Sequence, residues 1–390
     1  MGDVDFELTS EQLAIRDTCR DFAREVVAPA AEELDRESKF GYDVVRQMGE
    51  LGLFGLPFSE EFGGAGADFL SLCLAIEEIS RADTGVGITL EAAVCLGASP
   101  IYEFGTKEQK ERWLPDLFAG RKLWAFGLTE PEAGSDAGAT TTRAELRGGK
   151  WVINGAKQFI TNCGTDISAG VTVTAVTGKS NGRRPEISAL MIPTGTPGYH
   201  VQASYRKLGW HSSDTHPLSF EDCTVPQENL LGAQGGGYRQ FLHTLMGGRI
   251  AIAALSLGLA QACLDASLAY AKERRTFGVP ISKHQAIQFK LADMAMETEL
   301  ARTMVYRAAI TYMKAGAETS DEARMLAAMC KLYASEASKR AADQAVQIHG
   351  GYGFMEEYPV ARYWRDVKVN EIGEGTSEVQ RMLIARLLGA

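Results

Sequence analysis

The chain has 390 residues, of which 45% are hydrophobic and 23% are charged, a composition that is ordinary for a soluble globular protein. Its formal net charge is −10 and it has no basic run interleaved with aromatic residues, which argues against nucleic-acid binding. The N-terminus has no basic and apolar leader, and no run of about 20 uncharged apolar residues follows. We therefore expect neither export nor a membrane span.

The seven cysteines are scattered, odd in number and never spaced as C-x-x-C. This usage argues against a disulfide framework and against a zinc site. We expect a reducing, cytoplasmic location and no metal.

A helical pattern of apolar residues marks residues 1–123 as an N-terminal helical domain. A capping box, Thr9 with Gln12, opens the first helix. Later helices are predicted over residues 70–80 and 86–104, after a turn-rich link.

Residues 124–235 are predicted to form a middle β-domain, because short β-type runs separated by glycines replace the helical pattern. Gly148 and Gly149 join two of these runs as a hairpin. Further strands are expected over 170–177 and 187–192.

The helical pattern returns for residues 236–390, where we predict a C-terminal four-helix bundle. The segment 249–271 is almost wholly apolar or small, so this helix belongs in the core of the bundle. The expected fold class is mainly α with a β-domain.

Near the C-terminal end, Glu374 stands between Gly373 and Gly375, so a single carboxylate projects from a loop whose backbone can approach a ligand closely. A capping box of Ser377 with Gln380 is predicted to start a helix that anchors this loop. Taken alone, the fragment also fits an ordinary surface turn with a solvated glutamate.

Four further polar or glycine-rich stretches stand out, and each also has an ordinary structural interpretation. Residues 127–139, G-L-T-E-P-E-A-G-S-D-A-G-A, offer amides and hydroxyls to a heterocycle or a phosphate, or form a plain polar loop. Residues 158–162 place an aromatic ring and a hydroxyl on a strand, which core packing also explains. The arginines in 273–277 suit a pyrophosphate or a helix dipole, and the glycines after Gln347 suit a helix-ending turn.

In their order and spacing these motifs resemble the acyl-CoA dehydrogenases over nearly the whole chain, with residues 127–139 and 347–366 filling two family signatures. The resemblance implies an N-terminal helical domain, a middle β-barrel or sandwich and a C-terminal four-helix bundle. It also implies FAD between the last two domains and a homotetramer built as a dimer of dimers.

The resemblance assigns Glu374 as the catalytic base. The family often has Trp where Phe159 stands and Gln where Glu378 stands. A subset takes its carboxylate from the residue before the bundle arginine Arg249, here Gly248, so no rival to Glu374 is expected. The remaining assignments are cofactor contacts by Phe126, Leu128, Thr129, Ser135, Phe159, Thr161, Arg274, Arg275, Thr276, Phe277, His284, Gln285, Gln347, Gly350, Gly351, Thr376 and Glu378, and substrate contacts by Ser135, Arg249, Gly373 and Gly375.

The activity that the resemblance implies is α,β-dehydrogenation of an acyl-CoA thioester to a trans-2-enoyl-CoA. Glu374 would remove the α-proton, the β-hydrogen would leave as hydride to the flavin, and an electron-transfer flavoprotein would take the electrons. A flavin oxidase or monooxygenase of the same fold and a non-enzymatic flavoprotein module stay open, and a carrier-protein thioester could replace CoA. Straight-chain members of the family tend to carry Tyr where Gly373 stands, so we predict room for a branched acyl group such as isovaleryl, unless Val94 or Leu96 fills the gap.

Overall fold

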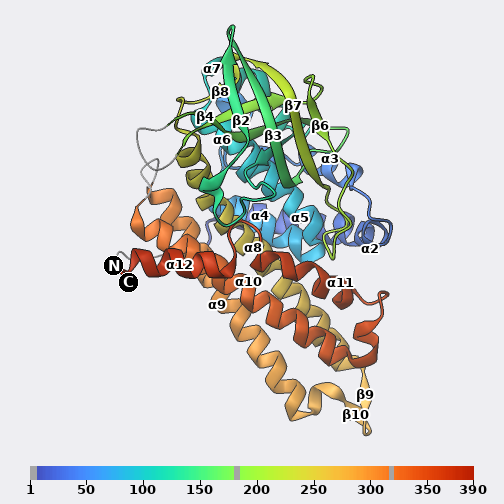
Figure 1. The fold of residues 1–390 in the computed structure, drawn as a ribbon. Coiled ribbons are helices and arrows are strands. Elements are labelled where there is room, and N and C mark those ends of the chain that lie inside the picture. Colours follow the sequence, from blue (N-terminus) through green and yellow to red (C-terminus); the bar gives the residue numbers. More distant parts are fainter. Residues whose placement is uncertain (1–6, 180–184, 316–319) are drawn as a thin grey trace.

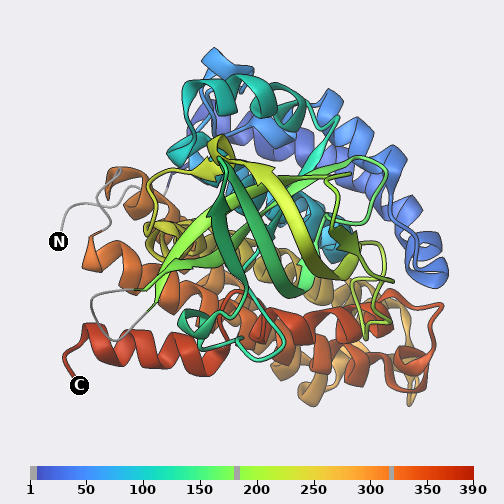
Figure 2. The same ribbon diagram turned by 45° about the horizontal axis from the view of Figure 1, so that its top comes forward.

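Helices occupy both ends of the chain and a β-sheet occupies its middle, in a computed structural model that describes residues 7–179, 185–315 and 320–390 (Figure 1). In Figure 2 the strands lie in front, with the N-terminal helices toward the top and the C-terminal helices toward the bottom of the view. The predicted fold class, mainly α with a β-domain, is confirmed.

The N-terminal helices begin as predicted, because the hydroxyl of Thr9 accepts the backbone N–H of Gln12 while the Gln12 side chain reaches back. Two π-helical turns, Ala23–Val27 and Ala92–Ala98, each join two α-helices into one longer rod. Such turns are frequent at functional sites. The helices are α1 Ser10–Phe22, α2 Ala28–Glu37, α3 Tyr42–Glu50, α4 Phe69–Ala82, α5 Thr84–Glu91, α6 Ser99–Phe104 and α7 Lys107–Phe118.

Eight strands form one hydrogen-bonded sheet. They are β1 Leu123–Gly127, β2 Arg143–Arg147, β3 Lys150–Thr161, β4 Ser168–Gly178, β5 Glu186–Pro193, β6 Tyr199–Val201, β7 Thr215–Pro226 and β8 Leu230–Leu231. Gly148 and Gly149 both have positive φ, of 55° and 76°, which confirms the hairpin between β2 and β3.

The main path through the sheet is β6-β7-β3-β2-β4-β5-β8. β1 pairs in parallel with the first half of β4, whereas β2 pairs with β4 through Arg143 and Val176. β1 and β2 therefore lie beside different halves of β4. The segment between Gly127 and Arg143, which connects them, leaves the sheet at this point.

In the described C-terminal residues, the long helix α10 packs against the long helices α8 and α9, and α12 packs on α10 (Figure 1). α8 is buried over most of its length, as its apolar sequence predicts, and it also packs against α4. The elements are α8 Gly237–Glu273, a hairpin of β9 Arg275–Thr276 and β10 Val279–Pro280, α9 Gln285–Ala315, α10 Asp321–His349, α11 Pro359–Asp366 and α12 Ser377–Leu387.

Two helical stretches, Thr84–Phe104 and Gly237–Glu273, are long and apolar enough to cross a membrane. Inside the protein, however, 89% and 78% of their most apolar windows are buried. Both are therefore core helices, and their contact places the N-terminal and C-terminal helices in one hydrophobic core.

Candidate active site

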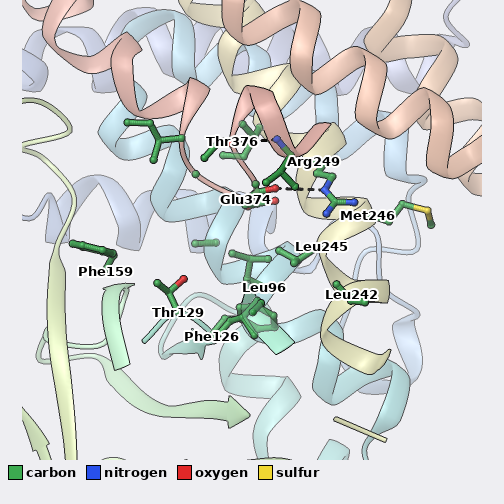
Figure 3. Close-up of a pocket in the computed structure, with 18 of the residues that line it drawn as sticks. Leu96, Phe126, Thr129, Phe159, Leu242, Leu245, Met246, Arg249, Glu374 and Thr376 are labelled. Carbon is green, nitrogen blue, oxygen red and sulfur yellow. Dashed lines mark hydrogen bonds between the residues drawn. The ribbon is translucent and has the colours of Figure 1, made fainter. Parts of the chain in front are cut away.

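A large cavity of about 2160 Å³ lies where the sheet, the α5–α6 rod, α8 and the loop before α12 meet. In Figure 3, Glu374 and Arg249 face it from one side, and Phe126, Thr129 and Leu96 lie on the other. The sequence-predicted residues that line it are Phe126, Leu128, Thr129, Ser135, Phe159, Thr161, Arg249, Gly373, Glu374, Gly375 and Thr376.

The loop that carries Glu374 has an uncommon backbone. Glu374 has φ 55° and Gly375 has φ 96°, both in the left-handed region. A non-glycine residue there costs roughly 1–2 kcal/mol, and such strain tends to persist at functional sites. Gly373 does not share this constraint, because its φ is not left-handed. A Cβ added there would also have room, since it would meet only the Val369 carbonyl oxygen, at 3.6 Å.

Three side chains from the bundle hold this loop by its carbonyl groups. Arg249 Nε donates to the Glu374 oxygen at 3.4 Å, and Lys331 Nζ donates to the Gly375 oxygen at 2.8 Å. Gln380 Nε2 donates to the same Gly375 oxygen at 2.9 Å. The strained loop is thereby fixed to α8, α10 and α12 together.

The predicted capping box of Ser377 with Gln380 is wrong by one residue. Thr376 is the N-cap, and its hydroxyl accepts the backbone N–H of Val379 at 3.3 Å. Ser377 is already helical, which leaves the Gln380 amide free to reach back to the loop carbonyls instead.

The carboxylate of Glu374 is placed to act as a base. Burial raises its pKa to about 7, an effect that the adjacent Glu91 side chain and the charges of Arg249 and Lys331 partly oppose. Burial likewise lowers the pKa of Lys331 to about 8. A carboxylate with a pKa near the working pH is the most effective general base.

The sequence analysis missed Glu91, at the end of α5, whose carboxyl lies beside that of Glu374. The sequence contained one indication of Glu91, which is the one charged residue in the apolar stretch 84–99. Charged residues are rarely buried without a partner, so its place in this stretch marks it out. Glu374 thus has a carboxyl neighbour that the sequence analysis did not consider. Gly248 leaves room for this carboxylate, because a Cβ at this position would lie 2.2 Å from Oε2 of Glu374 and the Glu374 side chain would have to move.

Opposite the base, an aromatic and polar wall suits a flat heterocycle. Phe159 has φ 61°, leaves 62% of its surface exposed and packs against the Tyr205 ring at 5.3 Å. The hydroxyl-bearing residues Thr129 and Thr161 line the same cavity, as does Trp210, whose buried Nε1 has no hydrogen-bond partner among the described residues. An exposed ring beside unused polar groups is what a bound conjugated ring system would cover.

A buried ion pair fixes the loop that carries Thr129 and Ser135. Lys157 Nζ lies 2.7 Å from the Glu130 carboxylate and donates to the Leu128 oxygen at 3.2 Å. The burial of Lys157 lowers its pKa to about 8, while the facing Glu130 carboxylate opposes that effect. The pair ties the loop to β3.

The remaining predicted cofactor residues do not line this cavity. They cluster where α8 ends, α9 begins and α10 ends, beside the β9–β10 hairpin at the far end of the bundle (Figure 1). Thr276 Oγ1 lies 2.9 Å from His284 Nε2 there, and Phe277 is 98% exposed. The residues of this distal cluster are Arg274, Arg275, Thr276, Phe277, His284, Gln285, Gln347, Gly350 and Gly351, and Glu378 lies apart from it on the exposed face of α12.

Comparison with known proteins gives the same domain types along the chain. The acyl-CoA dehydrogenase N-terminal, middle and C-terminal domain families match residues 9–121, 125–223 and 235–389. A probable acyl-CoA dehydrogenase, YngJ, of Bacillus subtilis (strain 168) is 53% identical over 385 residues, which are 99% of this chain and 100% of the relative. The mitochondrial short-chain specific acyl-CoA dehydrogenase of Mus musculus is 44% identical over 379 residues, 97% of this chain and 90% of the relative.

Solved structures agree over the whole chain. Butyryl-CoA dehydrogenase from Megasphaera elsdenii has a TM-score of 0.94 at 43% identity, with 99% of this chain and 100% of that chain covered. An acyl-CoA dehydrogenase complexed with FAD from Bacillus anthracis has a TM-score of 0.91 at 35% identity, covering 99% of this chain and 68% of that one. A chain from a study of the electron transferring flavoprotein of Acidaminococcus fermentans has a TM-score of 0.94 at 45% identity, with 99% of each chain covered. On fold, sequence and site geometry together, the chain belongs to the acyl-CoA dehydrogenase family.

Proposed function

We propose that this protein removes two hydrogens from the α and β carbons of an acyl-CoA thioester and so forms a trans-2-enoyl-CoA. As a member of its family it is an oxidoreductase and a flavoprotein whose cofactor is FAD. The observation that carries the proposal is the buried carboxylate of Glu374, held on a fixed loop in the cavity wall with a pKa of about 7.

In this proposal Glu374 takes the α-proton of the substrate. As that proton leaves, negative charge develops on the thioester oxygen, so a hydrogen-bond donor aimed at that oxygen accelerates the step. Among the described residues, no acceptor takes the backbone N–H of Glu374. This free N–H on the strained residue is therefore available as such a donor, while Arg249 and Lys331 hold the neighbouring carbonyls.

FAD, when bound, accepts the hydride from the β-carbon. Phe159, Thr129 and Thr161 would hold its ring system, and Ser135 would hold its phosphate region or that of CoA. The space beside Glu374 is lined by apolar side chains that would exclude water from the acyl chain, namely those of Ile88, Ala92, Leu96, Leu245 and Met246.

We further propose that the distal cluster serves the FAD of a second copy, in a homotetramer. The cluster is separated from the cavity in one chain, and apolar side chains stand exposed near it, with Phe277 98% and Phe289 60% exposed. An electron-transfer flavoprotein is the proposed electron acceptor, which the structural similarity to the Acidaminococcus fermentans chain supports.

Anaerobic titration of the purified yellow protein with butyryl-, octanoyl- and isovaleryl-CoA tests the proposal. We expect bleaching of the visible flavin absorption by at least one of the three. Rapid oxygen consumption during turnover would instead assign the protein to the oxidases. If only a carrier-protein thioester reduces the flavin, the substrate is that thioester and not an acyl-CoA. If no thioester reduces the flavin, the proposal is refuted.

A further inference from the structure

Glu91 is a second acidic group at the base of the cavity that the proposed reaction does not use. It ends α5, is fully buried, and stands where the helix passes into the π-helical turn Ala92–Ala98. The residues one turn before and one position after it, Ile88 and Ala92, line the cavity. The side chain thus lies directly behind the cavity wall.

Glu91 and Glu374 have no other way to satisfy their carboxyl oxygens. All four oxygen atoms are buried, and no amide, hydroxyl or cationic group of the described residues donates a hydrogen bond to any of them. The two carboxyl groups instead interact with each other. Two buried carboxylates in contact cannot both be ionised, whereas a single shared proton turns their repulsion into a hydrogen bond.

The charged neighbours decide which carboxyl keeps the charge. Arg249 on α8 and Lys331 on α10 both favour the ionised form of Glu374, and they have no comparable effect on Glu91. Cys95, one turn further along, faces both carboxyls, and its buried thiol stays neutral because its pKa is raised well above the usual value. Burial and the Glu374 charge raise the pKa of Glu91 well above its ordinary value.

We propose that Glu91 is a positioning residue for the base: it carries the shared proton and donates it in a hydrogen bond to the ionised carboxylate of Glu374. This bond would hold Glu374 in one rotamer and keep it unprotonated until substrate binds. In the reaction the α C–H bond breaks and its proton goes to Glu374, while the O–H bond of Glu91 stays intact. The pairing itself is a property of the protein, and only its effect on rate rests on the proposed function.

The pH dependence of flavin reduction tests the role, because the two substitutions at Glu91 differ in hydrogen bonding. In Glu91→Gln the amide still donates to Glu374, so the acidic limb of the rate profile should stay in place. In Glu91→Leu the donor is lost and the pKa of Glu374 rises. For a shift of about one unit, the rate at pH 6, taken as a fraction of the plateau rate, should be about tenfold lower than the same fraction in wild type. Glu77→Gln, which removes a buried carboxyl paired with Arg302 and Tyr306, is the matched control and should leave the limb unmoved.

Two measurements without substrate test the shared proton directly. Infrared spectra at pH 9, where Glu374 is ionised, should contain the carbonyl band of a protonated carboxylic acid that is missing from Glu91→Gln. Thermal unfolding gives a second test. The unfolded chain releases the Glu91 proton at the ordinary pKa of a glutamate, whereas the folded chain retains it. Glu91 therefore lowers the stability of the fold as pH rises from the unfolded-state pKa to the folded-state pKa. The Tm of Glu91→Gln relative to wild type should therefore increase from pH 5 to pH 8.

The outcomes separate this inference from the proposed function. If the infrared band is absent and the Tm difference is constant with pH, Glu91 is not the proton carrier. If Glu91→Leu changes acyl-chain preference but not the acidic limb, Glu91 shapes the pocket and does not position the base. If no thioester reduces the wild-type flavin, the proposed function fails, while the infrared and melting experiments still decide the pairing.

Discussion

At the scale of single residues, the proposed reaction depends on the carboxylate of Glu374. Glu374→Gln keeps the shape of the side chain but cannot accept a proton, so we expect flavin reduction to fall at least 10²- to 10⁴-fold with FAD content unchanged. Stopped-flow reduction by an acyl-CoA measures this. Glu111→Gln, on the exposed surface of α7, is the control. Near-normal reduction by Glu374→Gln would assign the base elsewhere.

The pKa of Glu374 sets the direction of the pH dependence. Because a base must be ionised and its pKa is about 7, kcat/KM should rise about tenfold per pH unit below pH 7 and level off above it. A profile measured between pH 5 and pH 9 checks this. A rate that falls as pH rises through 7 would contradict the assignment.

Gly373 belongs to the substrate side of the loop. Its Cβ position has room and its φ is not left-handed, so Gly373→Tyr should fold and place a ring in the acyl pocket. We expect wild type to oxidise isovaleryl-CoA at least as well as butyryl-CoA, and Gly373→Tyr to reverse that preference, since each well-packed methylene contributes about 1–3 kcal/mol. Comparing kcat/KM for the two substrates decides it.

Gly375→Ala gives the matched comparison, because φ 96° and contact with the Gln380 amide strain any side chain there. It should lower the rate with both substrates and leave their ratio unchanged. A straight-chain preference that Gly373→Tyr does not alter would mean that Leu96 or Val94 already fills the space.

At the scale of elements, α10 controls the catalytic loop through Lys331, which is buried and donates to the Gly375 oxygen. Lys331→Met removes this bond and a positive charge near Glu374. We therefore expect the acidic limb of the rate profile to move up by about one pH unit. Lys339→Met, an exposed change on the same helix, should not move it.

Sequence patterns predicted the elements whose cause is local. The glycines at 148 and 149 specify the hairpin through their positive φ, and the Thr9 hydroxyl specifies the start of α1. The π-helical turn Ala92–Ala98, which is almost wholly buried, has no such local signature. The shift of the α12 cap to Thr376 has a similar origin, since the Gln380 amide bonds the loop that the bundle holds in place.

At the scale of the whole molecule, the separation between the cavity and the distal cluster predicts complementation between subunits. Glu374→Gln and Arg275→Ala should each be inactive alone, the second through loss of FAD. Coexpressed, they should regain activity, because some sites in mixed oligomers would combine an intact Glu374 with an intact distal cluster from the partner. Activity of the purified mixed oligomer measures this, and a mixture as inactive as its parents would place each FAD within one chain.

The sequence indicated that the loop of Glu374 and the polar stretch around Thr129 are candidate site segments, because each is a contiguous motif. It could not indicate that Glu91, 283 positions before Glu374, meets it, because only the packing of α5 against the bundle creates that contact. Nor did it show that Lys331 supports the loop, since one lysine in a helical pattern has no distinguishing spacing.

The close approach of Gly248 to the Glu374 carboxylate means that the position of the base could be exchanged. A side chain at 248 would compete with the Glu374 carboxylate for the same space, so the Glu374 side chain would have to move. Gly248→Glu alone should displace Glu374, whereas combining it with Glu374→Gly would bring a carboxylate to nearly the same point from α8. If this double variant reduces its flavin with an acyl-CoA, the proposed base is defined by a location in the cavity and not by one backbone position.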